Sequence, residues 1–378
     1  EALILIFVFG WALEYVFFVT ELTSAFLFYY RAEKLPPRTH VIFGWIYAIS
    51  AWLSLVAITG ITAFMLHPGD WPRDRSFWSG FLNPQFLPQT VARTGGAFLA
   101  ASLYVYLHAS FRLRGNPEML SMISRRSARP GLLGAILVTL GGIWWYFALP
   151  DSAQAALVAA APLNILMMLI FLVTIVVFAM YYLGPYRQPG WVTPGFSILL
   201  FTLGLAAIGS GEFIREAVRK PYIAYDVVFS NQIYKEELPK LRAEGYLEGG
   251  VWTKAWTAER HPEAIGPDGR IELATLSGLP AEERHRLGAV LFQYHCNDCH
   301  SAEAGYSAVA HLTRGWTPGM VRQLVLHPER AHFFMPPWAG TAPEAELLQE
   351  YLVAISEPFP KGLPDLGGPP DRAPAFGR

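Results

Sequence analysis

The sequence predicts an all-α membrane protein, in which a six-helix transmembrane bundle is followed by a small helical domain. Charged residues make up only 16% of the 378 residues and hydrophobic residues 53%, a balance that is unusual for a soluble protein. The charge is also uneven, because the first 220 residues contain six apolar runs long enough to cross a bilayer. Both cysteines of the chain lie in the more polar remainder.

The six expected spans cover about residues 1–30, 41–66, 88–111, 131–149, 155–184 and 192–214. We expect four regions: a transmembrane domain (1–220), a connector (221–282) with one helical piece at 233–244, a compact domain (283–357) and an extended Pro/Gly-rich tail (358–378). The chain opens with Glu1 inside an apolar run, which suggests a processed product, a fragment or a missing beginning. No internal repeat, phosphate loop or basic patch suited to nucleic acid is visible, so we expect no nucleic-acid partner.

Basic residues predict the orientation of the bundle in the membrane. Nine of them fall on the side reached after the first, third and fifth spans: Arg31, Lys34, Arg38, Arg112, Arg114, Arg125, Arg126, Arg129 and Arg187. Only Arg73 and Arg75 fall on the opposite side. The basic side is expected to be cytoplasmic, in a bacterial cytoplasmic membrane. Six spans then place residues 221–378 on the outer, periplasmic side.

The most specific motif is Cys296-Asn297-Asp298-Cys299-His300, which reads C-x-x-C-H, the attachment signature of a c-type haem. Two thiols at this spacing can add to the two vinyl groups of one porphyrin, and the adjacent imidazole can reach the iron. A redox C-x-x-C is typically found near a βαβ pattern, which this sequence lacks, and a zinc site normally needs a second Cys or His pair nearby. We therefore expect one covalent haem c, held by Cys296, Cys299 and His300.

The residues before and after the C-x-x-C-H motif also have an informative pattern. An apolar-periodic run (286–292) precedes it, a loop-rich stretch follows, and then come Met335-Pro336-Pro337-Trp338 and a last helix over 343–356. With these features, residues 283–357 resemble a class I cytochrome c. The resemblance implies that the first and last helices of this domain cross each other. It also implies that the Met-Pro-Pro turn presents Met335 as the distal iron ligand.

Other side chains are alternative distal ligands: His311, His327, His332 and Met320. Met335 is preferred because the two prolines that follow it fix a rigid loop. His/Met ligation raises the reduction potential of a haem. We therefore expect an electron carrier at the positive end of a chain, with His300 and Met335 as iron ligands and no open site for chemistry.

Three passages characterise the membrane part. They are the segment 21–27 (Glu-Leu-Thr-Ser-Ala-Phe-Leu) followed by a basic turn and His40, the segment 81–84 (Phe-Leu-Asn-Pro), and the segment 211–222 (Gly-Glu-Phe-Ile-Arg-Glu-Ala-Val-Arg-Lys-Pro-Tyr). In this order they resemble subunit I of the cytochrome bd quinol oxidases and relatives that keep its scaffold. The last segment is similar to the G-x-x-x-x-E-x-G-R-Q-P-W block of that family.

The resemblance gives two carboxylates a role. Glu21 falls where the family has a carboxylate next to its high-spin haems, and Glu216 where it has a haem-ligating or haem-adjacent glutamate. The residues alone support the same interest, because an acid within a span is costly and usually faces protein, water or a cofactor. Glu14 shares a helix face with Glu21, so the pair could relay protons or neighbour a haem iron. The alternative is that Glu14 is solvated at the outer surface.

Three arginines have two interpretations each. Arg215 and Arg219 are expected at the outer end of the last span, and Arg93 near the outer end of the third. Each guanidinium could hold a haem propionate through paired hydrogen bonds, or could extend to the membrane surface while its stem stays in the apolar layer.

The sequence also departs from the oxidase family. Its first helices, which carry an axial histidine, have no counterpart, Gln89 stands near the position of a low-spin haem histidine, and the loop over 150–155 is too short for the family's quinol loop. These departures remove expected residues for oxygen reduction and quinol binding. His40, His67 and His108 lie at span ends. His40 and His108 could clamp a haem b on the cytoplasmic side, or could simply be solvated.

Together these features predict a membrane-anchored c-type cytochrome, an electron-transfer subunit of a respiratory redox complex. It would pass electrons between a membrane partner and a soluble or peripheral carrier on the outer side. The bundle would contact lipid and other subunits of the complex, for which an aromatic content of 14% is suitable. Two alternatives stay open: a divergent bd-type terminal oxidase with haem b or d in the bundle, and a cofactor-free anchor for the haem c domain.

Overall fold

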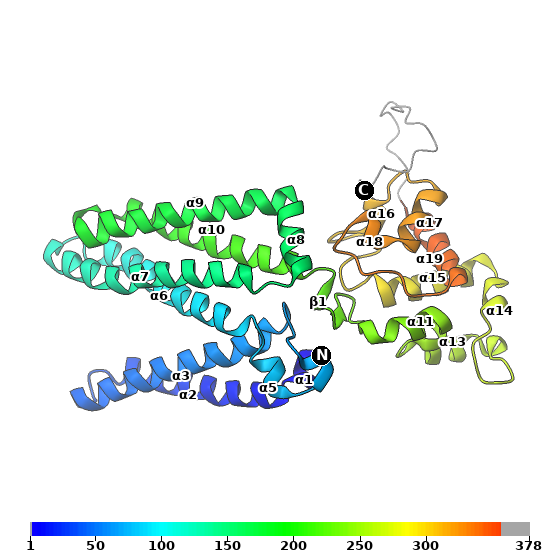
Figure 1. The fold of residues 1–378 in the computed structure, drawn as a ribbon, viewed down its shortest axis with the longest axis horizontal. Coiled ribbons are helices and arrows are strands. Elements are labelled where there is room, and N and C mark those ends of the chain that lie inside the picture. The colour runs from blue at the N-terminus through cyan, green and yellow to red at the C-terminus, as the bar shows by residue number, and fades with distance from the viewer. Residues whose placement is uncertain (1, 357–378) are drawn as a thin grey trace, which may run out of the picture. The chain divides into compact units, whose positions relative to one another are not determined.

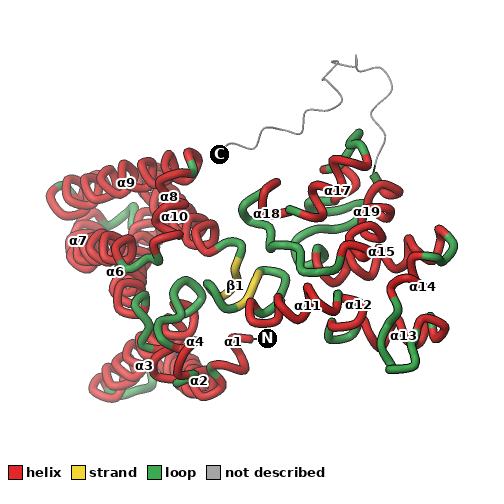
Figure 2. Tube along the Cα trace, turned by 45° about the vertical axis from the view of Figure 1, so that its right-hand side comes forward, coloured by secondary structure: helices red, strands yellow, loops and turns green. Residues whose placement is uncertain are grey.

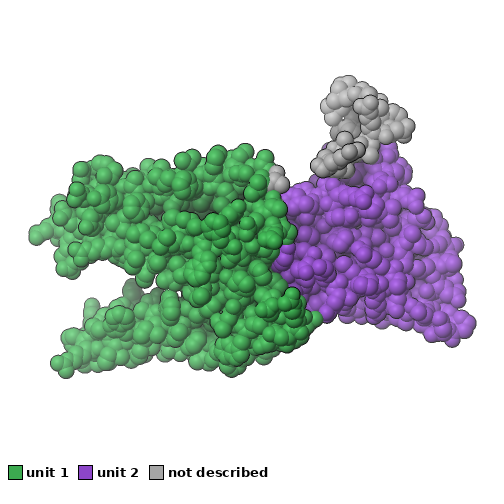
Figure 3. Space-filling view, viewed as in Figure 1, with its two compact units in different colours: residues 1–219 green, residues 220–378 purple. Residues whose placement is uncertain are grey.

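The computed structural model describes residues 2–356, and most of them are helical (Figures 1 and 2). This agrees with the all-α class; within the described residues the strands are limited to one short pair. The chain forms two compact units, residues 1–219 (unit 1) and residues 220–378 (unit 2), coloured separately in Figure 3. The tail expected over 358–378 lies outside the described residues.

Unit 1 contains six long helices joined by short ones. The long helices are α2 (Val8–Tyr30), α3 (Pro37–Ala63), α6 (Phe86–Arg112), α7 (Pro117–Phe147), α9 (Ala161–Tyr181) and α10 (Pro194–Arg219). The short ones are α1 (Ala2–Ile6), α4 (Trp71–Asp74), α5 (Phe77–Phe81), α8 (Asp151–Ala159), a π-helical turn (Tyr182–Arg187) and a 3₁₀ turn (Pro189–Trp191). Proline in the first turn of α3, α7 and α9 suits a helix start, where its missing N–H costs nothing.

The observed helix bounds differ most from the expected spans in two places. The fourth helix, α7, begins at Pro117 rather than near residue 131, because Asn116 caps it by accepting a hydrogen bond from the Met119 N–H (3.0 Å) and Pro130 does not end it. The fifth span is divided into α8 and α9. Pro162, near the start of α9, disfavours helical geometry at the preceding residue and explains the break.

Five helices of the described chain are both long and apolar enough to cross a membrane: Val8–Tyr30, Pro37–Ala63, Pro117–Phe147, Ala161–Arg187 and Pro194–Arg219. The helix at the expected third span, α6, has sufficient length but is not among the five. Buried polar side chains explain its lower hydropathy, since Gln89, Thr90, Ser102 and Ser110 all lie inside the unit. The five-helix result supports a membrane protein, and the third span stays a prediction.

Small residues bring α6 and α7 together. A Cβ atom added at Gly95 would lie 2.6 Å from the Gly134 carbonyl oxygen, and one added at Gly134 would lie 2.6 Å from the Gly95 carbonyl oxygen. The two backbones therefore touch, as is typical of membrane helices with small interface residues. Helix α6 also contacts α3 and α10, so it is an inner helix of unit 1.

The helices of unit 1 reverse direction at two opposite ends. Figure 1 shows the α2–α3, α6–α7 and α9–α10 connections at one end, and α1, α5 and α8 at the other. Arg31, Lys34, Arg114 and Arg187 belong to the first end, whereas Arg73 and Arg75 belong to the second. These four basic residues thus lie at the end opposite Arg73 and Arg75, as the sequence predicts, whereas Arg125, Arg126 and Arg129 lie within α7. The side of the membrane that each end faces stays a prediction.

Unit 2 is built from short helices around one core. Its elements are β1 (Tyr222–Ala224), β2 (Val228–Phe229), a 3₁₀ turn (Lys235–Glu237), α11 (Leu238–Glu244), α12 (Tyr246–Gly249), α13 (Thr253–Arg260), a 3₁₀ turn (Pro262–Ala264), α14 (Leu273–Ser277), α15 (Ala281–His295), α16 (Val309–Leu312), α17 (Pro318–Leu326), α18 (Pro328–Ala331) and α19 (Ala342–Ile355). The two strands pair antiparallel, with Tyr222 opposite Phe229.

The segment expected as a connector, 221–282, belongs to this core. Leu241, Leu247 and Leu276 are fully buried and share one apolar cluster with Leu287 and Leu348 of the following part. The helical piece expected over 233–244 corresponds to the 3₁₀ turn and α11. Apolar contacts of this kind tie residues 221–282 to the following residues, so the segment is a folded part of unit 2.

Helices α15 and α19 meet at Gly288. A Cβ atom added there would lie 2.4 Å from the Leu347 carbonyl oxygen and 2.5 Å from the Tyr351 Cβ. Only glycine allows the two backbones to approach so closely. This contact joins the helix before the C-x-x-C-H motif to the last described helix, which is the pair that the sequence expects to cross.

Candidate functional site

The C-x-x-C-H motif forms a single turn at the end of α15. The Cys299 N–H and the His300 N–H both donate to the Cys296 carbonyl, at 3.2 and 3.0 Å. Cys299 is exposed and Cys296 is partly buried. Burial raises the pKa of the Cys296 thiol to about 12, so this sulfur stays protonated at neutral pH. The turn places both thiols and the imidazole on adjacent positions of one local segment.

The His300 ring is oriented through its Nδ1 atom. Nδ1 lies 2.9 Å from the Ser307 carbonyl oxygen, and because a carbonyl can only accept, Nδ1 carries the proton. The Ser307 hydroxyl lies 3.1 Å from the same nitrogen. In this tautomer the lone pair of Nε2 is the one that a metal would use. A backbone carbonyl on the far nitrogen is the usual arrangement for a ligating histidine.

Met335 lies in the loop between α18 and α19 and is partly buried, and its N–H donates to the His332 carbonyl at 2.9 Å. Pro336 and Trp338, which follow it, are buried. Among the described residues, no hydrogen bond or ring contact joins Met335 to His300. The indole Nε1 of Trp338 is a buried donor for which the described residues supply no partner. A buried, unpaired donor beside the Met-Pro-Pro turn is a position where a polar group of a bound cofactor would be stabilised.

These features fit the haem c that the motif implies. Cys296 and Cys299 would hold the porphyrin, and His300 and Met335 would ligate the iron. A zinc site fits less well, since no cluster of three or more His, Cys, Asp or Glu side chains suited to a metal ion occurs within residues 2–356.

The alternative distal ligands have other surroundings. His332 is exposed and stacks on Phe333 at 5.3 Å, and its Nδ1 accepts the Phe334 N–H at 3.3 Å. His327 lies beside Glu329 with 3.6 Å between Nδ1 and Oε1. Met320 is partly buried in the first turn of α17, where its N–H donates to Thr317. His311 is exposed. Met335 thus remains the predicted distal ligand, which the two prolines that follow it favour.

The sequence does not identify a polar network that lies beside the motif. His295 is 7% exposed, and its Nδ1 lies 2.8 Å from the Tyr246 hydroxyl and 3.2 Å from the Asn231 amide nitrogen. Burial lowers the pKa of His295 to about 4, so the ring is neutral at pH 7. Tyr246 and Asn231 come from the segment expected as a connector. The feature of the sequence that could have indicated a folded segment here is the apolar pair Tyr246 and Leu247, which directly follows Gly245.

Glu344 supports the same region from α19. It is fully buried, and it accepts the Leu247 N–H at 2.7 Å and the Thr341 N–H at 2.8 Å. Burial raises the pKa of this carboxyl, while the backbone donors act in the opposite direction. Gly245 has a positive φ of 87°, and a Cβ there would lie 2.6 Å from the carboxylate oxygens. The carboxylate thus links α12 to the start of α19.

In unit 1, the expected acidic pair lies on α2. Glu14 Oε1 accepts a hydrogen bond from the Ser54 hydroxyl of α3 at 3.0 Å, and Glu14 interacts electrostatically with Glu21. Both side chains are partly buried. The structure therefore brings the two carboxylates to one face of α2, and Glu14 has a protein partner within the unit.

Glu216, Arg215 and Arg219 form ion pairs along the last turns of α10. Arg219 is 6% exposed and bonds Glu216, whereas the Arg215 Nε donates to Glu212 at 2.7 Å. Arg93 of α6 lies within electrostatic range of Glu212 and Arg215. Glu212 was the residue missed from the sequence; it lies one turn before Glu216. Each expected arginine thus has an acidic neighbour in unit 1.

The other candidate residues of unit 1, three histidines and Gln89, contact neighbouring protein groups. His40 Nε2 lies 3.0 Å from the Phe28 carbonyl near the end of α2, and its ring stacks on Phe28 at 4.2 Å. This contact uses the nitrogen that a haem ligand would need. His108 is exposed and stacks on Tyr104, and the His67 Nδ1 accepts the Gly69 N–H. Gln89 is buried and donates to Gln85 at 3.4 Å, which in turn donates to the Trp145 carbonyl.

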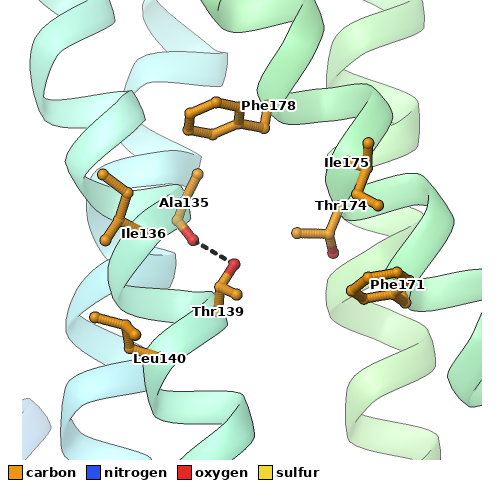
Figure 4. Close-up of a pocket in the computed structure, with 8 residues that line it drawn as sticks. All are labelled: Ala135, Ile136, Thr139, Leu140, Phe171, Thr174, Ile175 and Phe178. Atoms are coloured by element: carbon orange, nitrogen blue, oxygen red, sulfur yellow. Dashed lines mark hydrogen bonds between the residues drawn. The ribbon is translucent and has the colours of Figure 1, made fainter.

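An apolar groove of about 310 Å³ lies between α7 and α9 (Figure 4). Its lining residues are Ala135, Ile136, Thr139, Leu140, Phe171, Thr174, Ile175 and Phe178. The Thr139 hydroxyl is occupied by a hydrogen bond to the Ala135 carbonyl, at 2.9 Å. No ionisable side chain lines this groove, so it offers an apolar surface and no acid–base chemistry.

Comparison with known proteins addresses unit 1. Residues 5–146 match the family model of cytochrome bd terminal oxidase subunit I. The match includes Glu21 and the 81–84 segment and ends before the 211–222 segment. No curated protein and no solved structure matches the chain. With the five apolar helices, the match indicates a membrane protein with a role in respiratory electron transfer.

Proposed function

We propose that this protein is a membrane-anchored c-type cytochrome, the electron-transfer subunit of a respiratory redox complex. The observation that carries the proposal is the Cys296–His300 turn, in which Nδ1 of His300 is hydrogen-bonded to the Ser307 carbonyl and no described residue forms a hydrogen bond with Nε2. Two thiols and a metal-ready imidazole in five residues have a specific use in covalent haem attachment. When bound there, haem c supplies reversible one-electron chemistry.

The distal side supports a carrier rather than a catalyst. Met335, followed by two prolines, would be a second iron ligand beside His300, an arrangement typical of electron carriers. A thioether ligand raises the reduction potential, which suits transfer toward an acceptor. Cys299 is exposed, so a porphyrin edge attached there would be within reach of an external redox partner.

Orientation follows from the basic residues. The end of unit 1 that carries Arg31, Lys34 and Arg187 would face the cytoplasm, and unit 2 would lie on the periplasmic side. Electrons would then pass between a partner in the membrane and a soluble or peripheral carrier outside. Protease added to sealed right-side-out vesicles is expected to release a haem-bearing peptide. Full protection of that peptide would contradict the orientation.

A second candidate function is favoured by the family match over residues 5–146. In this alternative the protein is a divergent bd-type terminal oxidase, with haem b or d in the bundle and haem c as the entry point for electrons. Glu21, Glu216, Arg215 and Arg219 would then neighbour or hold the bundle haem. A third alternative is a bundle without cofactors that only anchors unit 2.

The pyridine haemochrome spectrum of the purified chain separates these functions. Haem c alone supports the carrier or the cofactor-free anchor, and the absence of haem c contradicts both. Haem b or d in addition to haem c supports the oxidase-like alternative. Because the cytochrome bd scaffold is the part that the family match covers, the spectrum also decides whether this scaffold keeps its cofactors here.

A further inference from the structure

The loop that carries Met335 is fastened by hydrogen bonds at two points, Pro336 and Ala339. The Ala339 N–H donates to the Tyr246 hydroxyl oxygen at 3.0 Å, and this hydroxyl lies 2.8 Å from His295 Nδ1. The His295 ring also bonds the Pro336 backbone. Tyr246 and His295 therefore form a bridge whose two ends hold the backbone directly after Met335.

The chemistry of the groups assigns each donor and acceptor. A proline backbone offers only a carbonyl, so the ring nitrogen that faces Pro336 carries the proton and donates. In a neutral imidazole the other nitrogen, Nδ1, must accept, and Tyr246 donates to it. The tyrosine oxygen then accepts the Ala339 N–H. In this series of hydrogen bonds, from Pro336 through His295 and Tyr246 to Ala339, each group acts as a donor or acceptor that its chemistry allows.

The bridge is rigid because it is buried. Tyr246 is fully buried, and Trp338 and His295 are each 7% exposed. The Trp338 ring packs edge-on against Tyr246 at 4.9 Å and against His295 at 5.2 Å. Hydrogen bonds in such an apolar setting are stronger than in water, and loss of one partner leaves a buried group unsatisfied.

We propose that Tyr246 is a positioning residue for the distal ligand: its hydroxyl, through His295 and Ala339, holds the Met335 thioether in place to bind the iron. The inference rests on the proposed function, since it concerns the same haem. A thioether is a neutral, weak ligand, so its bond to the iron depends on a loop that is already in place before ligation. The segment 221–282 thereby contributes to the properties of the haem site.

The test compares Tyr246→Phe with Tyr294→Phe in the full-length, haem-loaded protein. Tyr294 is a matched control, because its ring packs on Tyr246 at 5.1 Å while its hydroxyl accepts the Val251 N–H at 3.4 Å. Among the described residues this hydroxyl forms no hydrogen bond with the loop. Imidazole is titrated against the oxidised protein, and the weak charge-transfer band of the methionine–iron bond is followed. We expect Tyr246→Phe to lose the band at a roughly fivefold lower imidazole concentration than wild type, the ratio that corresponds to one neutral hydrogen bond.

Equal imidazole midpoints for the two variants, with covalent haem intact in both, would overturn the inference and leave the proposed function standing. Absence of covalent haem from the wild type would instead contradict the function itself. A urea titration of both variants separates a general loss of stability of unit 2 from a specific effect on Met335. A general loss would lower the urea unfolding midpoints of both variants without a difference in their imidazole midpoints.

If Tyr246→Phe does not accumulate, Asn231→Ala provides the second variant. It removes the other donor to His295 Nδ1, at 3.2 Å, and keeps the tyrosine. We expect a smaller shift of the imidazole midpoint in the same direction. A midpoint identical to that of the wild type would contradict a role for this network in holding Met335.

Discussion

The two units of this protein carry their chemically important residues in different ways. In unit 2 the two thiols and the His300 imidazole fall within one turn, from Cys296 to His300, so their arrangement depends on local backbone geometry. In unit 1 the charged residues are spread over α2, α6 and α10, and each meets its partner through helix packing. A site made by one turn can be recognised from spacing, whereas a site made by packing needs the fold.

The difference between a site made by one turn and a site made by helix packing can be tested by mutation. We expect the largest effect from removing the two cysteines of the turn in unit 2. The double change Cys296→Ala and Cys299→Ala should abolish covalent haem completely, because no other thiol exists in the chain. Haem staining after denaturing electrophoresis measures the attachment. Each single change should keep one thioether bond. Haem that stays on the double variant through denaturation would mean that attachment does not use this turn.

A smaller effect is expected at the distal side of the same unit. Met335→His should lower the reduction potential by roughly a few tenths of a volt, since axial ligands set haem potentials over a range of about 0.8 V. Imidazole favours ferric iron more than a thioether does, and the methionine charge-transfer band should disappear. Redox titration is the measurement, with Met320→His as control. A band and potential that survive replacement of Met335 would assign the ligand elsewhere.

The pH dependence of unit 2 should report the buried His295. Its pKa is lowered from 6.5 to about 4 in the folded protein, so folding favours the neutral ring. The corresponding stabilisation is present above pH 6.5 and is lost as the pH falls toward 4, by about 3 kcal/mol in total. Urea unfolding followed by haem circular dichroism in detergent measures it. His295→Gln should flatten this part of the pH profile, and an unchanged profile would show that another group is responsible.

The smallest effect is expected in unit 1, where the site depends on packing. Glu216→Gln keeps the shape of the side chain but leaves the guanidinium of Arg219, which is 6% exposed, without its carboxylate. We expect electron flow into haem c in native membranes to slow severalfold. Glu212→Gln is the matched control one turn away, where Glu212 is 54% exposed and the effect should be weaker. Unchanged rates and cofactor content would leave Glu216 as a helix-end ion pair.

The helices of unit 1 could be predicted from the sequence, but the packing between them could not. Long apolar runs indicated the helices of unit 1 to within a few residues, except where Asn116 starts α7 early and Pro162 divides the fifth run. The polar surface of α6 is compatible with its position because Gly95 and Gly134 bring α7 against it. Hydropathy alone does not contain that information, so α6 does not qualify as a span by composition.

The candidate site of unit 2 shows the same limit. Spacing was sufficient for Cys296, Cys299 and His300. The network of Asn231, Tyr246 and His295 was not predictable, because Tyr246 and Asn231 lie 49 and 64 residues before His295 and meet it only in the folded core. The segment 221–282 is rich in Gly and mixed in charge, and this composition suggested a connector. Its buried Leu241 and Leu247 were the signal of a folded part.

The central claim is that this chain carries one haem c at the Cys296–His300 turn. Mass spectrometry of the purified protein, intact and after proteolysis, tests it most directly. We predict that the intact chain is heavier by the mass of one haem and that the peptide containing Cys296 and Cys299 carries all of this mass. An unmodified peptide with both thiols free to react with an alkylating reagent would contradict the claim.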